Sequence, residues 1–192
     1  MIGTWVQSIA LMWLAYRLTG STAFTGLVGF LNSIPYLVLS PLAGVLGDRF
    51  DRRRILMTAL TLMGMQAFAL ALLSGFQLVT PPLLAALALV GGLCNSFETP
   101  TRQAFFVQII DKREDLPNAI ALNSILMNGA RLVGPSIGGL IIASAGETAC
   151  FALNALSYLA VLYALRHTRT VHERPARKAS RDPRPQPFGS FG

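Results

Sequence analysis

Long apolar runs separated by short charged segments dominate the pattern of this chain. Asp, Glu, Lys and Arg are absent from residues 2–16, 18–47, 55–97 and 148–165. The run at 55–97 is too long for one membrane helix of about 20 residues, but it fits two helices joined near Gly75. The runs also lack the period-two alternation of membrane strands. The pattern therefore predicts six transmembrane helices, at 2–18, 24–47, 54–75, 81–98, 118–145 and 147–166.

Composition supports a membrane protein. The chain has 192 residues, of which 53% are hydrophobic and only 13% are charged, whereas soluble domains carry about 25% charged residues. A water-soluble enzyme or nucleic-acid-binding protein is excluded on this ground. The predicted fold class is an all-α polytopic membrane protein.

The basic residues lie mostly on one side of the predicted membrane segments. Of the 16 Lys and Arg residues, all but Arg17 and Arg131 fall between helices 2 and 3, between helices 4 and 5, or after helix 6. Basic residues near the ends of membrane helices are retained on the cytoplasmic side. We therefore expect a plasma (inner) membrane protein with both termini in the cytoplasm. This sidedness accounts for the net charge of +7 without a nucleic-acid partner.

The two ends of the chain differ from the rest. A helix over 2–16 rises only about 22 Å, short of a hydrocarbon core of about 30 Å, so we expect the first helix to begin upstream of Met1. Residues 167–192 are polar and rich in Pro and Arg, which predicts a disordered cytoplasmic tail, or one that binds anionic lipid headgroups. The predicted domains are a bundle at 1–166 and a tail at 167–192.

No pattern of catalytic or metal-binding residues is evident. Cys94 and Cys150 lie in or beside apolar runs and suggest neither a disulfide framework nor a zinc site. An integral membrane enzyme needs a cluster of His, Asp or Glu at a membrane face, and none is visible. We therefore predict a protein that is not an enzyme and that has no cofactor and no bound metal.

A charged motif joins the second and third predicted helices. A carboxylate flanked by arginines at such a junction can pair across it or face a helix terminus. The motif resembles the signature of the major facilitator superfamily between helices 2 and 3, with Asp51 where the signature has its second glycine. The resemblance implies a conformational latch; the alternative is that the basic residues serve topology alone. The latch residues are Gly44, Asp48, Arg49, Arg52 and Arg53.

A second motif lies in the fifth predicted helix. Its proline removes a helix hydrogen bond, and its small residues recur every four positions, a spacing that favours close helix packing. It resembles the helix-5 motif of the antiporter branch of the same superfamily, although Ala121 and Ala130 stand where that motif has glycines. The resemblance implies a site of bending and packing, at Ala130, Gly134, Pro135, Gly138 and Gly139.

Further stretches are similar to exporters of the enterobactin-exporter and macrolide-efflux type. They are residues 3–7, 18–21 and 95–119, and with the motifs they extend the resemblance over residues 1 to about 165. The resemblance implies efflux of a small organic molecule, such as a siderophore or drug, by alternating access and typically with proton exchange. The arginine that many drug antiporters carry in helix 4 for proton coupling is absent here.

Arg131 is the residue singled out for function. It lies near the middle of a predicted membrane helix, where a charge costs about 2.5–3.5 kcal/mol and usually faces a cavity, an acid or a substrate. We hypothesise that it holds an anionic substrate group or pairs with an acid on a helix that this chain lacks. The alternative is a structural role satisfied by backbone carbonyls. Weaker candidates for lining the cavity are Asn32, Asn123, Asn128 and Gln66, since such residues more commonly form interhelical hydrogen bonds.

A weak internal repeat favours the same architecture. The residues Leu-Asn-Ser-Ile occur at 31–34 and again at 122–125, in the second and fifth predicted helices. Three-plus-three inverted repeats equate those two helices. We expect the amino-terminal six-helix half of a transporter, completed by a second half or by a second copy of this chain. The competing interpretation is a non-transporting membrane subunit or a truncated, inactive gene product.

Overall fold

The chain folds into helices. The computed structural model describes residues 2–49, 51–109 and 116–167, without the side chains of 41–49, 52 and 107–109. Within these ranges there is no strand, so the prediction of an all-α fold is confirmed. The helices are α1 (Ile2–Thr19), α2 (Thr22–Arg49), α3 (Arg52–Gly75), α4 (Pro81–Ile109) and α5 (Leu116–His167).

Short polar residues define the helix boundaries. Gly20, with a φ of 63°, ends α1, and the Ser21 hydroxyl then accepts the backbone N–H of Phe24 at 3.3 Å to cap α2. At the next junction the Asp51 carboxylate accepts the backbone N–H of Arg53 at 3.0 Å and caps α3. α4 runs on to Ile109, past the predicted end of the fourth membrane segment at 98. Charged side chains end an apolar run without ending a helix.

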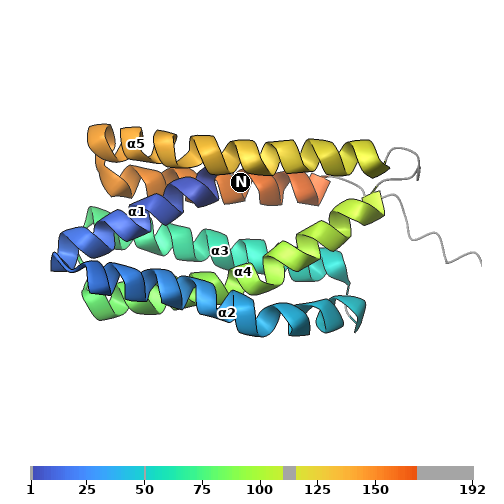
Figure 1. The fold of residues 1–192 in the computed structure, drawn as a ribbon, viewed down its shortest axis with the longest axis horizontal. Helices are drawn as coiled ribbons and strands as arrows, with labels where there is room; N and C mark the ends of the chain where they lie inside the picture. Colours follow the sequence, from blue (N-terminus) through green and yellow to red (C-terminus); the bar gives the residue numbers. More distant parts are fainter. Residues whose placement is uncertain (1, 50, 110–115, 168–192) are drawn as a thin grey trace, which may run out of the picture.

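α5 reverses direction at Gly146. This glycine has non-helical angles, with a φ of 79° and a ψ of 172°, which it tolerates because it lacks a Cβ. Figure 1 shows α5 doubling back into two antiparallel segments, 116–145 and 147–167. Near the turn, the Cys150 thiol donates to the carbonyl of Gly138 at 3.8 Å. The break falls at the residue that separates the last two predicted helices.

The helices pack as a bundle in which successive helices run in opposite directions, so that α2 and α4 are parallel to each other (Figure 1). α2 lies against α4, α1 lies mainly against α5, and α3 lies between α4 and α5. Fully buried side chains from all five helices fill the centre, where Leu14, Val28, Leu70, Leu84 and Phe151 meet in one cluster. The core therefore joins segments far apart in the sequence.

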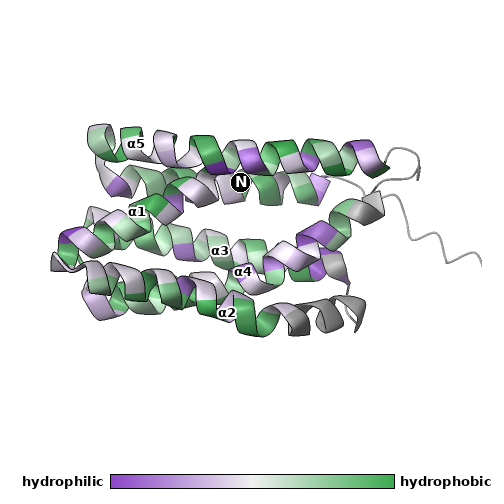
Figure 2. Ribbon diagram, in the orientation of Figure 1, coloured by the Kyte–Doolittle hydropathy of each residue, from purple (hydrophilic) through white to green (hydrophobic). Residues whose placement is uncertain are grey.

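The outer surface is apolar. Figure 2 shows hydrophobic residues along the outside of the helices, where Leu37, Leu132 and Leu140 are each more than 70% exposed. Within the described residues, α2, α3, α4 and α5 are long and apolar enough to cross a membrane. Six separate crossings remain a prediction.

The two ends of the bundle differ in charge. The α2–α3 junction and the carboxyl ends of α4 and α5 lie at one end, on the right in Figure 1. These segments carry most of the described basic residues, whereas Arg17 lies near the α1–α2 turn at the other end. Lys112, Arg113 and the tail from 168 onward lie outside the described residues.

Candidate functional site

A cation lies near the middle of the first α5 segment, with an aromatic ring as its partner. Arg131 is about 22 Å along the helix from either end of segment 116–145, at 1.5 Å per residue. It is exposed, and its Cζ lies 5.5 Å from the ring centroid of Trp5, within the range of a cation–π interaction. The described carboxylates pair with other arginines: Asp51 with Arg54 at 3.5 Å, Glu98 with Arg102 at 2.7 Å and Glu147 with Arg17 at 2.5 Å.

Small residues of the helix-5 motif bring α5 against α1. A Cβ added at Gly134 would lie 2.5 Å from the Cβ of Trp5, and one at Gly138 would lie 3.4 Å from the Cα of Val6. Ala130 is buried on the same face of the helix, and we call these three small residues the small-residue stripe. Trp5 is therefore seated directly on Gly134, one turn from Arg131.

The other members of that motif lie differently. Gly139 faces open space, and the helix continues through Pro135 without a non-helical residue. Within the described part of α5, the only break lies at Gly146. The predicted bend at Pro135 stays a prediction.

Two opposite flanks border this stripe on the first α5 segment. At 100° per residue, Ser124, Asn128 and Arg131 lie within about 60° of one another, and we call this the polar flank. All three are exposed. About 170° away lies an apolar flank of exposed large side chains, Leu122, Leu126, Val133 and Leu140. One side of the segment is thus suited to lipid or an apolar partner, whereas the other side is polar at membrane depth.

A network of amide side chains joins the helices elsewhere in the bundle. Asn154 donates to Gln7 at 2.6 Å, Gln7 donates to Gln66 at 3.0 Å, and Gln66 donates to the carbonyl of Leu87 at 3.1 Å. Asn32 donates to the carbonyl of Ala88 at 3.1 Å. We call these four side chains the amide network; its members are Gln7, Asn32, Gln66 and Asn154. They connect all five helices.

Glycines on α4 bring this network together. A Cβ added at Gly91 would lie 3.2 Å from the Nε2 of Gln66 and 3.4 Å from the Nδ2 of Asn32. One added at Gly92 would lie only 2.3 Å from the backbone oxygen of Asn32. The adjacent glycines therefore allow α2 and α4 to approach closely.

The structure separates the asparagines that were grouped with Arg131. Asn128 shares the polar flank, where its amide donates to the carbonyl of Ser124 at 2.9 Å. Asn123 is half-buried, with its amide 3.8 Å from the sulfur of Met127. Asn32 belongs to the amide network. Their role in lining a cavity stays a prediction, but only Asn128 lies on the same flank as Arg131.

The helix 2–3 motif lies at the more basic end of the bundle. The side chains of Gly44, Asp48, Arg49 and Arg52 lie outside the described residues. Arg53 donates to the carbonyl of Leu165 at 2.6 Å and so connects α3 to the end of α5. Asp51, at the position of the signature glycine, has a φ of −59°, so this turn needs no left-handed residue.

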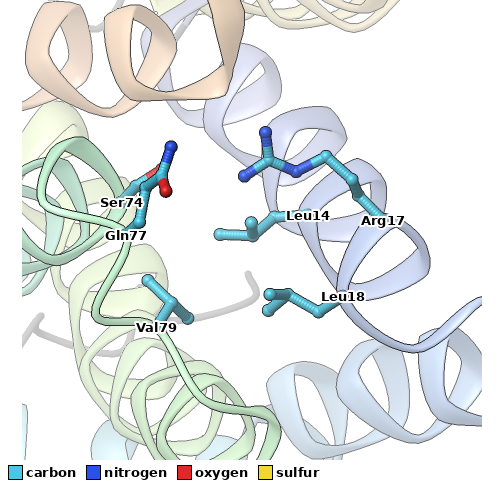
Figure 3. Close-up of a pocket in the computed structure, with 6 residues that line it drawn as sticks. All are labelled: Leu14, Arg17, Leu18, Ser74, Gln77 and Val79. Atoms are coloured by element: carbon cyan, nitrogen blue, oxygen red, sulfur yellow. The ribbon is translucent and has the colours of Figure 1, made fainter.

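An ion pair closes the opposite end of the bundle. Glu147, directly after the α5 reversal, is buried and accepts from Arg17 of α1 and, at 3.3 Å, from the hydroxyl of Ser74 of α3. Beside it lies a cavity of about 330 Å³ (Figure 3). Leu14, Arg17 and Leu18 line it on one side, and Ser74, Gln77 and Val79 line it on the other.

Several of these residues were missed in the sequence. Gln7 and Asn154 are isolated amides in apolar runs, and that isolation is itself a signal for interhelical hydrogen bonding. The Gly91-Gly92 pair signals a close helix approach. No pattern within α1 indicated that Trp5 meets Arg131, because this contact depends on the packing of α1 against α5.

Comparison with known proteins gives consistent matches. A family model described as transmembrane secretion effector matches residues 1–182. The chain is 29% identical over 166 residues to the staphyloferrin A transporter of Staphylococcus aureus, covering 85% of this chain and 42% of that protein. It is 29% identical over 148 residues to the multidrug efflux pump Tap of Mycolicibacterium fortuitum, covering 75% and 36%. It is 22% identical over 151 residues to macrolide efflux protein A of Streptococcus pyogenes, covering 79% and 37%. The chain spans about two fifths of the length of these curated relatives.

Proposed function

Because this chain belongs to the transmembrane secretion effector family of the major facilitator superfamily, we propose that it is one half of a transporter that exports a small organic molecule. Family membership confirms the resemblance drawn from the sequence motifs, and it makes the chain an integral membrane protein of a transporter family. Relatives are named as a staphyloferrin A transporter, a multidrug efflux pump and a macrolide efflux protein. A siderophore or drug-like molecule is accordingly the proposed cargo.

The proposed architecture is six membrane crossings arranged as a three-plus-three inverted repeat. The reversal of α5 at Gly146 supports it, since a helix of 52 residues would otherwise rise about 78 Å. A second six-helix half, or a second copy of this chain, completes the pathway. The two halves rock about a midplane site in alternating access, with proton exchange as the proposed driving reaction.

The proposed orientation places both termini in the cytoplasm of the inner membrane. It is supported by the position of the α2–α3 junction and the ends of α4 and α5 at one end of the bundle. At that end, Asp48 and the arginines of the helix 2–3 motif would form the conformational latch. The bond from Arg53 to Leu165 supports this, since it connects the motif to another helix.

The polar flank is the observation that carries the proposal. An exposed arginine halfway along a membrane helix is energetically unfavourable in contact with lipid, whereas it is well hydrated when it faces a water-filled cavity. A transport pathway between two halves supplies such a cavity.

Deletion at the native locus tests export while natural partners stay present. Cells with an in-frame deletion of this coding segment, and complemented cells, are loaded with a panel of siderophores and antibiotics, and efflux is measured. We expect the deletion to slow efflux of at least one compound at least twofold, with restoration by complementation. Unchanged efflux of every compound would favour the non-transporting subunit or inactive product instead.

A further inference from the structure

We propose that Arg131, held over the indole of Trp5, binds a carboxylate of the exported molecule, so that organic acids are the transported class. This inference rests on the proposed export function and names its substrate class. It also assigns Trp5 as a positioning residue for the guanidinium.

The charges of the described residues leave a cation available on the polar flank. Asp51, Glu98 and Glu147 each pair with an arginine of their own, and none contacts Arg131. At membrane depth an exposed cation requires compensation by water, an acid or a ligand. A ligand carboxylate supplies the missing charge.

The cation–π contact sets the geometry of binding. The Arg131 Cζ lies 5.5 Å from the Trp5 ring centroid, and among the described residues no hydrogen-bond partner is seen for its N–H groups. A carboxylate can accept from such a planar fork through two parallel hydrogen bonds. Trp5 cannot move far, because its Cβ is packed on Gly134. The arginine is thus preorganised by α1.

The polar flank has other donors, but they are engaged. The Ser124 hydroxyl donates to the carbonyl of Ile120, and the Asn128 amide donates to the carbonyl of Ser124, each at 2.9 Å. Among the described residues of the flank, Arg131 is therefore the charged group that can orient a ligand.

Trp5 itself provides the readout for a binding test. The chain has two tryptophans, and Trp13 is 47% exposed, so Trp13→Phe leaves Trp5 as the sole indole fluorophore. The full chain in lipid nanodiscs is titrated with 4-nitrobenzoate, 4-nitrobenzamide and 4-nitrobenzylammonium, which quench indoles and differ in charge. We expect saturable quenching by the anion and only weak, linear quenching by the neutral and cationic probes.

Variants of the arginine sharpen this test. In the same background, Arg131→Gln should raise the Kd for 4-nitrobenzoate about tenfold or more, because the charge-assisted bonds are lost. Arg131→Lys should raise it less, since it keeps the charge without the fork. Arg166→Gln, the same change near the end of α5, should leave the Kd unchanged. Equal quenching by all three probes, or an unchanged Kd in Arg131→Gln, overturns the proposal.

Trp5 is tested through export in the native host. Trp5→Phe keeps an aromatic face and should retain at least half of the acid export, whereas Trp5→Leu should lower it severalfold at equal protein level and thermal stability. Equal export by both variants contradicts the positioning role.

Experiments in the same host distinguish a carboxylate of the exported molecule from a carboxylate that belongs to a partner half. If a partner half supplied it, Arg131→Gln would weaken copurification of that half while leaving the preference for acids over matched amides unchanged, and that result overturns the proposal. We expect the preference to be lost and copurification to be kept.

If the deletion strain loses export of neutral or cationic compounds only, the transporter function stands and the substrate class is wrong. If the deletion strain exports every compound at the normal rate, the proposed export function is itself wrong.

Discussion

The amide network and the polar flank are both sets of polar side chains within apolar helices, but they differ in where their partners lie. Gln7, Gln66 and Asn154 are bonded to one another across α1, α3 and α5. Arg131 on the polar flank is exposed and meets only the face of an aromatic ring among the described residues. In a membrane helix, polar groups satisfied inside the bundle stabilise it, whereas an exposed charge points to a cavity or ligand. We therefore expect the network to stabilise the bundle, and we propose that the flank carries the function.

The largest loss of stability is expected at the α2–α4 contact that supports the network. Gly92→Ala would place a methyl group 2.3 Å from the backbone oxygen of Asn32, so the helices must separate. We expect a loss of about 1–3 kcal/mol in the free energy of unfolding, measured by SDS titration in mixed micelles. Gly26→Ala on α2, with open space around it, is the control and should cost nothing. Equal effects of the two changes would show that the contact is unimportant.

A smaller loss is expected when one amide is removed. Gln66→Leu leaves the donor of Gln7 and the carbonyl of Leu87 without their partner, which should lower stability by about 1–2 kcal/mol. Adding Gln7→Leu should cost less in this background than in the wild type, because the two side chains share a bond. Additive losses in the same SDS titration would mean that the network is not coupled.

The ion pair at the far end is expected to contribute less. Glu147→Gln removes the ion pair with Arg17. The Glu147 side chain is only 6% exposed, but the arginine left without its partner is 49% exposed and stays hydrated, and the amide oxygen can still accept from Ser74. We expect a loss of about 1 kcal/mol or less, which shrinks further in high salt. A loss larger than that of Gln66→Leu would contradict this ranking.

The smallest stability effect is expected on the polar flank. Arg131→Gln breaks no ion pair within the described residues and should change the free energy of unfolding by no more than about 0.5 kcal/mol. Arg131→Gln and Gln66→Leu are compared side by side by SDS titration. If both lose the same stability, the distinction between network and flank is wrong.

Much of the fold was predictable, because charge-free runs and small polar residues mark helices and turns directly. The sequence also predicted the reversal between residues 145 and 147, where a glycine precedes Glu147. It did not predict that α4 continues to Ile109, since hydropathy reports apolar length and not helix length. Contacts between distant helices, such as Trp5 with Arg131, depend on packing that no local pattern encodes.

The site was predictable only in part. Arg131 and Asn128 were identified because they are polar residues within a predicted membrane helix, and the structure places them on one flank. Asn32, chosen on the same ground, bonds to Ala88 within the amide network. Depth alone cannot distinguish the two cases, because both lie in apolar helices and differ only in the partners that folding provides.

The most direct test is export by Arg131→Gln in the native host. Efflux of a carboxylate compound and of its amide is measured in strains carrying the wild type, Arg131→Gln or Arg166→Gln at equal membrane protein levels. The account predicts that Arg131→Gln lowers acid efflux about tenfold while thermal stability stays at the wild-type value, and that Arg166→Gln changes neither. Acid efflux that is unchanged in a folded Arg131→Gln protein would contradict the claim that the polar flank is the substrate-binding surface.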